Sequence, residues 1–126
     1  MLLTKSSVRV DPAKNRVYLV MEGLHDLDEA RRMRDAYASA VAQCARGFTV
    51  LADVRDYRPG SEEVQAVHAE AVKIAARHGA RRVARVTGET PLGGMQIQRI
   101  AQGEHVSYES RAFKTIEAAE AYLDAP

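Results

Sequence analysis

The run Phe48–Val54 constrains the fold of this chain more than any other stretch. It reads Phe-Thr-Val-Leu-Ala-Asp-Val, and the charged turn sequence Arg55–Gly60 follows it. Helix-like patterns flank it on both sides. A strand that is apolar at adjacent as well as alternate positions is usually covered on both faces. The run therefore predicts an interior strand of an α/β sheet.

Two shorter alternating stretches, Ser7–Val10 and Arg16–Glu22, precede this run and predict an antiparallel hairpin. Between them, Pro12 presets the φ angle of a turn and Asn15 tolerates a left-handed conformation. The second stretch is the more apolar of the two, so we expect it to lie further inside the sheet.

Apolar residues recur at helical spacing over residues 27–46 and again between Ser61 and Gly79. Asp26 and Ser61 are good N-caps, and the glycines at 47 and 79 stand where these helices should stop. The next predicted elements are a strand at Arg82–Thr87 and a helix from Pro91 to about Gln102, which Thr90 caps. They are followed by a short strand at His105–Tyr108 and a last helix at Ile116–Leu123, which Thr115 caps.

The predicted order of elements is ββαβαβαβα. It indicates a single α/β domain over residues 1–126, with one open mixed sheet of five strands. The hairpin is antiparallel, and the later strands, each reached through a helix, should be parallel with right-handed crossovers.

Composition argues against several classes of function. Eighteen basic and seventeen acidic residues nearly cancel, so no strong field favours nucleic acid or an anionic membrane. No apolar run approaches the ~18–20 residues of a membrane span. Cys44 is the single cysteine, which excludes an internal disulfide and favours a reduced, buried thiol in a cytoplasmic protein. We expect no metal and no cofactor.

The chain resembles the SpoIIAA-like proteins of the STAS superfamily. The resemblance rests on the hairpin, the long helix, and the segments Ala52–Asp56, Arg82–Ile100 and Ala112–Leu123. It implies a small binding or interaction module. Some members act as anti-sigma-factor antagonists, and relatives with the same layout bind lipids or other apolar ligands.

The antagonists carry an Asp-Ser-(Ser/Ala)-Gly motif, whose serine is phosphorylated, at the start of the helix after the central strand. Here the corresponding sequence is Arg-Pro-Gly-Ser-Glu-Glu, residues 58–63, so Ser61 is the only residue that could correspond to the phosphorylated serine. The two carboxylates after it would repel a phosphate, although the helix N-terminus would offset part of the repulsion. N-capping is the favoured role of Ser61.

In an open α/β sheet, ligands bind outside the carboxyl ends of the parallel strands. Here that rim comprises the loops Arg55–Ser61 and Gly88–Gly94. Asp53 should find a partner in a neighbouring arginine or in loop N–H groups. The glycine loop meets no nucleotide-binding motif, and capping with a tight turn is its favoured explanation. The candidate binding residues are Asp53, Arg55, Asp56, Tyr57, Ser61, Thr90, Gly93 and Gly94.

No catalytic set can be assembled from the sequence. The four histidines do not cluster, and His68 is expected to be half-buried and hydrogen-bonded. The favoured hypothesis is a non-enzymatic module that binds a protein partner or small ligand at the rim, with a homodimer through a sheet edge or helix face. The alternative is a carrier of apolar, lipid-type ligands, or a small enzyme, with a pocket beneath the 91–102 helix.

Overall fold

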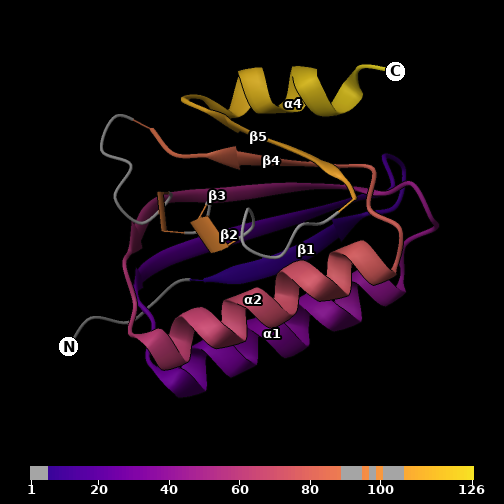
Figure 1. Ribbon diagram of the computed structural model, residues 1–126. Helices are drawn as coiled ribbons and strands as arrows, with labels where there is room; N and C mark the ends of the chain where they lie inside the picture. Colours follow the sequence, from indigo (N-terminus) through magenta and orange to yellow (C-terminus); the bar gives the residue numbers. More distant parts are fainter. Residues whose placement is uncertain (1–5, 89–94, 97–98, 101–106) are drawn as a thin grey trace.

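The computed structural model describes residues 6–88, 95–96, 99–100 and 107–126. Five strands form one sheet in the order β1–β2–β3–β4–β5 (Figure 1). β1 and β2 form an antiparallel hairpin, and β2 to β5 run parallel to one another. The strands span Ser7–Asp11, Arg16–Leu24, Thr49–Arg58, Arg82–Val86 and Glu109–Phe113. The predicted mixed α/β sheet, with its apolar run at the centre, is confirmed.

Three labelled helices cover the sheet: α1 (Leu27–Ala42), α2 (Glu62–Arg77) and α4 (Ile116–Asp124). α1 and α2 lie side by side on one face, and α4 lies on the other (Figure 1). The predicted caps are present, because the side chains of Asp26, Ser61 and Thr115 each accept a hydrogen bond from the backbone N–H three residues ahead. Asn15 adopts the expected left-handed conformation, with φ 51°.

The first helix ends earlier than predicted. It stops at Ala42 rather than at residue 46, and the next two N–H groups, of Gln43 and Cys44, bond three residues back to Ala40 and Val41. Such bonds tighten the last turn and close the helix. The left-handed Gly47 belongs to the connection that follows, since its N–H bonds to the Gly79 carbonyl. Cys44 is a half-buried free thiol.

The predicted last strand is wrong. β5 begins at Glu109 and pairs with β4 from Arg82 onward, whereas the prediction placed a strand at residues 105–108. Residues 105 and 106 lie outside the described part of the chain, and 107 and 108 form a bend. β5 is an edge strand with four exposed residues out of five, so apolar patterning could not reveal it. The helix predicted from 91 to 102 also falls mostly outside the described residues.

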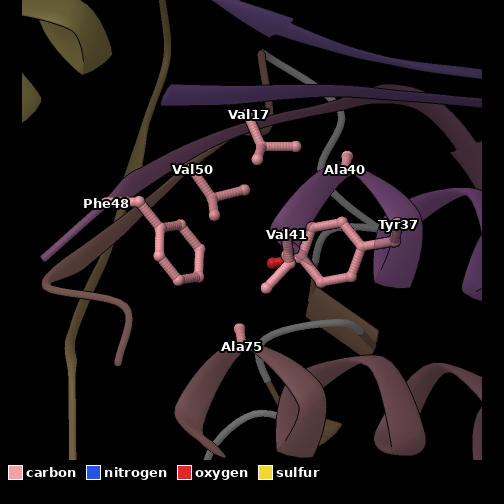
Figure 2. Close-up of a cluster of buried hydrophobic side chains, with 7 residues drawn as sticks. All are labelled: Val17, Tyr37, Ala40, Val41, Phe48, Val50 and Ala75. Atoms are coloured by element: carbon pink, nitrogen blue, oxygen red, sulfur yellow. The ribbon is translucent and has the colours of Figure 1, made fainter. Parts of the chain in front are cut away.

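The largest core cluster lies between the sheet and the helix pair (Figure 2). The side chains of Val17, Phe48 and Val50 come from the sheet side and meet Tyr37 and Val41 of α1, with α2 closing the cluster from below. Phe48 is fully buried. Truncating a side chain of this size in such a cluster costs about 3–5 kcal/mol.

The opposite face is closed by α4. Ala119 and Leu123 pack on Leu51, Ala84 and Val86 of the sheet. Next to this apolar contact, Arg16 donates to Glu120 at 2.8 Å, to Asp124 at 2.9 Å and to Thr49 at 2.8 Å. No helix in the described ranges is both long and apolar enough to cross a membrane.

Candidate functional site: a cavity between the sheet and the helix pair

A cavity of about 80 Å³ lies between the central strands and α1 and α2. Strands β2 to β5 form one wall and the two helices the other. This volume is several times the ~10–15 Å³ that a single water molecule needs by this measure. The lining residues are mainly apolar: Leu19, Met21, Met33, Tyr37, Val50, Ala52, His68, Ala71, Val72, Val83, Arg85, Tyr108 and Ser110.

Arg85 is the one ionic side chain among the described residues of this lining. Alternation along β4 directs Val83 and Arg85 into the cavity, whereas Ala84 and Val86 pack towards α4. The side chain is 4% exposed, Nη1 donates to Ser110 Oγ, and Nε has no partner. Burial lowers the pKa of Arg85, but an arginine remains protonated in proteins.

Three rings form a second polar group beside the cavity, which we call the ring cluster: His25, Tyr57 and His68. Their centroids are 5.0 Å, 5.3 Å and 5.6 Å apart, in the pairs His25–Tyr57, His25–His68 and Tyr57–His68. All three are buried, and each has one polar atom without a hydrogen-bond partner: His25 Nδ1, Tyr57 Oη and His68 Nε2. His68 also lines the cavity, so the cluster and the cavity are continuous.

Burial determines the ionisation of the ring cluster. It lowers the pKa of His68 to about 4, with a smaller contribution from His25, and it lowers the pKa of His25 as well. It raises the pKa of Tyr57 to about 12. Tyr108, across the cavity, has its pKa raised to about 12 by burial. Near neutral pH these four side chains are therefore uncharged.

An irregularity in β3 places Tyr57 in this cluster. Val20 of β2 pairs with Asp53, but Glu22 pairs with Asp56, so β3 carries one extra residue between these points. Such a bulge reverses the side-chain alternation beyond it. Val54 and Tyr57, three residues apart, consequently pack in the same cluster on the helix-pair face.

The serine nearest to a histidine does not form a hydrolytic triad. Ser6 Oγ lies 2.8 Å from His25 Nε2, but it also accepts from the Glu22 backbone N–H at 3.0 Å. The other ring nitrogen of His25 has no partner, so no carboxylate orients this ring. Within the described ranges, no group of three or more metal-ligating side chains gathers.

The rim predicted from the sequence lies at the carboxyl ends of β3 and β4. Asp53 finds the expected arginine, because Arg55 binds it through Nε at 2.9 Å and Nη2 at 2.7 Å. The amide of Gln96 exchanges hydrogen bonds with the backbone of Gly60, at 2.8 Å and 3.2 Å. The segment after β4 therefore meets the turn after β3, as the topology predicted.

Other predicted rim residues are placed differently. The expected loop from 55 to 58 is strand, since β3 continues to Arg58. Tyr57 is buried in the ring cluster, so it is not part of an exposed patch. Arg55, Asp56 and Ser61 are exposed, and Ser61 caps α2. Thr90, Gly93 and Gly94 lie outside the described residues.

Sequence reasoning missed both the ring cluster and Arg85. His25, Tyr57 and His68 come from three separate elements, so no sequence spacing could have grouped them. His68 was expected to be half-buried and hydrogen-bonded, but it is 7% exposed and its Nε2 has no partner. Arg85 did leave a signal, because it alternates with Val83 in the strand predicted at Arg82–Thr87.

The comparisons with known proteins support the fold. The structure resembles an uncharacterized protein of the DUF3478 family with a SpoIIAA-like fold from Shewanella loihica PV-4. The TM-score is 0.76 at 14% sequence identity, and the match covers 98% of this chain and 97% of that one. No protein-family model and no curated protein matches the sequence. The chain therefore has a SpoIIAA-like fold.

Proposed function

We propose that this SpoIIAA-like chain is a non-enzymatic binding module that holds a small, mainly apolar ligand in the cavity between its sheet and the α1–α2 pair. The observation that carries the proposal is the lining itself. Apolar side chains from four elements, including Leu19, Met33, Val50 and Val72, surround a few polar groups. An apolar pocket with a small number of convergent polar groups is the usual form of a small-molecule site.

Two methionines make this lining adaptable. Met21 and Met33 both face the cavity and are 4% and 3% exposed. A methionine side chain has three rotatable bonds and a polarisable sulfur, so it adjusts to ligands of different outline. The cavity thus favours the carrier-type alternative over the rim as the ligand site.

A protein partner at the rim is a second candidate. Arg55 and Asp56 are exposed at the carboxyl end of β3, beside the Gln96–Gly60 contact. Arginine is enriched at interface hot spots. Binding at this surface and binding in the cavity can be tested separately, because substitutions at Arg55 would leave the cavity lining intact.

The methionine methyl groups offer a direct test of the cavity. In ¹³C-methyl NMR spectra, titration with benzamide, benzoate, 1-hexanol or hexanoate should shift the Met21 and Met33 signals. Met95, which is 49% exposed and outside the lining, is the internal control. No shift of Met21 or Met33 with any of these probes would count against the proposal.

A cavity-filling variant sharpens this test. Ala71 lines the cavity, so Ala71→Leu should abolish the methyl shifts. Ala66→Leu is the matched control, because Ala66 is an exposed residue of the same helix. Equal responses of the two variants would place the binding elsewhere.

A further inference from the structure

We infer that the ligand of this cavity is a small monocarboxylate whose charged end pairs with Arg85. The inference rests on the proposed function and adds the chemical class of the ligand. It follows from a buried cation that faces an apolar cavity and has no counter-charge in the described part of the chain.

The first step is the missing counter-charge. The described lining contains no aspartate or glutamate, and among the described residues the hydrogen-bond partner of the Arg85 guanidinium is the neutral hydroxyl of Ser110. A buried charge without a partner of opposite sign is strongly unfavourable. Arg16 is buried to a similar degree, but its charge is paired with the carboxylates of Glu120 and Asp124.

The second step is the free donor. Arg85 Nε lies within the protein and has no hydrogen-bond partner among the described residues. A guanidinium presents its N–H groups in a planar fork that matches the two oxygens of a carboxylate. A carboxylate entering the cavity beside this guanidinium would supply the missing counter-charge.

The third step is the number of charges. Arg85 is the single cation of the described lining, and the groups facing it are the neutral His68, Tyr37 and Tyr108 together with apolar side chains. One negative charge is compensated there, whereas a second would be left buried and unpaired. This favours a monoanion over a doubly charged phosphate ester.

The fourth step is size and shape. The cavity has about 80 Å³, and the walls beside Arg85 are formed by residues such as Val83, Ala52 and Ala71. An apolar cavity of ~150 Å³ holds one benzene ring, so this smaller space suits a short carbon chain next to the carboxylate, or a ring that enters it in part. Hexanoate and benzoate are the corresponding probes.

The test compares each acid with a neutral molecule of the same outline by isothermal titration calorimetry: benzoate with benzamide, and hexanoate with 1-hexanol. Phenyl phosphate serves as the doubly charged probe. We expect the wild-type protein to bind each acid about ten-fold or more tightly than its neutral counterpart. Phenyl phosphate should bind more weakly than benzoate.

The variants assign this preference to one side chain. Arg85→Met should lose about ten-fold or more in affinity for the acids and little for the neutral probes. Arg82→Met is the matched control, because Arg82 lies on the same strand and contacts α4 on the opposite face. It should keep the preference for acids. If Arg85→Met does not fold, Arg85→Lys keeps the charge without the fork and should bind acids at intermediate strength.

The outcomes separate the two proposals. Equal affinity for acids and neutral molecules, unchanged in Arg85→Met, would overturn the carboxylate inference and leave the apolar site standing. Loss of the acid preference in Arg82→Met as well would also overturn it. If neither acids nor neutral molecules bind the wild-type protein, the cavity is not a ligand site and the proposed function fails with it.

Discussion

Arg16 and Arg85 are buried to nearly the same degree, but they project from opposite faces of the sheet and differ in their partners. Arg16 binds the carboxylates of Glu120 and Asp124 beneath α4. Arg85 faces the cavity, where it donates a hydrogen bond to the hydroxyl of Ser110. One arginine therefore fastens a helix to the sheet, whereas the other supplies a cation to the interior.

This contrast predicts opposite effects on stability. Arg16→Met should lower the free energy of unfolding by about 1–3 kcal/mol, because it removes the hydrogen bonds that connect β2 to α4. Arg85→Met should be neutral or stabilising by about 1–3 kcal/mol, since it replaces an unpaired buried charge by an apolar chain. Urea unfolding at pH 7, without added ligand, measures both. A larger loss in Arg85→Met than in Arg16→Met would show that Arg85 is structural.

Acid should destabilise the fold through His68. An unfolded histidine titrates near 6.5, whereas burial holds the pKa of His68 at about 4. Between these values the unfolded chain binds a proton that the folded chain does not, so the free energy of unfolding falls as the pH is lowered. The stabilisation is complete above about pH 6.5 and lost below about pH 4. It corresponds to about 3 kcal/mol.

A comparison of variants isolates this effect from the titration of carboxylates. The groups around His68 are His25 and Tyr57 in the ring cluster, and Arg85, Tyr37 and Tyr108 in the cavity. His68→Leu should show a flatter pH dependence of unfolding between pH 6.5 and 4 than the wild-type protein. His78→Gln, at the exposed end of the same helix, should follow the wild-type curve. Parallel curves for wild type and His68→Leu would refute the assignment.

Tyr57 should contribute through its ring rather than its hydroxyl. The Tyr57 hydroxyl is buried without a hydrogen-bond partner, so Tyr57→Phe should be neutral or stabilising by up to about 1 kcal/mol. Tyr57→Ala should cost about 3–5 kcal/mol, as for other large core truncations. Thermal unfolding of the two variants at pH 7 distinguishes them. A clear loss in Tyr57→Phe would reveal a partner for the hydroxyl.

The architecture of the sheet could be predicted from the sequence because the features that determine it are local. The apolar run from Phe48, the helix caps and the turn at Asn15 are local signals that act within a few residues. They led to the correct order of strands in the sheet and the correct parallel pairing, while the helix predicted at 91–102 lies mostly outside the described residues. The edge strand β5 was misplaced because it buries too little to carry an apolar pattern.

The candidate site could be predicted only in part. The meeting of the segments after β3 and β4 follows from strand order, and Gly60 contacts Gln96, although residues 89–94 of the predicted second loop lie outside the described chain. The ring cluster depends on a bulge in β3 that turns Tyr57 inward, and no residue pattern in the sequence predicts that bulge. The cavity depends on how α2 packs on the sheet. This packing involves segments that are distant in the sequence, so local patterns do not predict it.

Gly60 should be intolerant of any side chain. A Cβ atom there would lie 2.8 Å from Val64 Cγ1 and 3.2 Å from Tyr57 Oη. Gly60→Ala should therefore cost about 1–3 kcal/mol through overpacking. In the double variant with Val64→Ala, part of the loss from the glycine change should be recovered, and a double-mutant cycle measures that coupling. Strict additivity would show that the contact does not limit substitution.

The most direct test of the account is the mass of the protein purified from its own host without denaturation. Native mass spectrometry should show the polypeptide with one small organic acid, released on unfolding and absent from Ala71→Leu and Arg85→Met. It also reports whether the chain forms a homodimer. Recovery of the polypeptide mass alone, or equal retention of a small molecule in Ala71→Leu, would contradict the claim that this cavity is a ligand site.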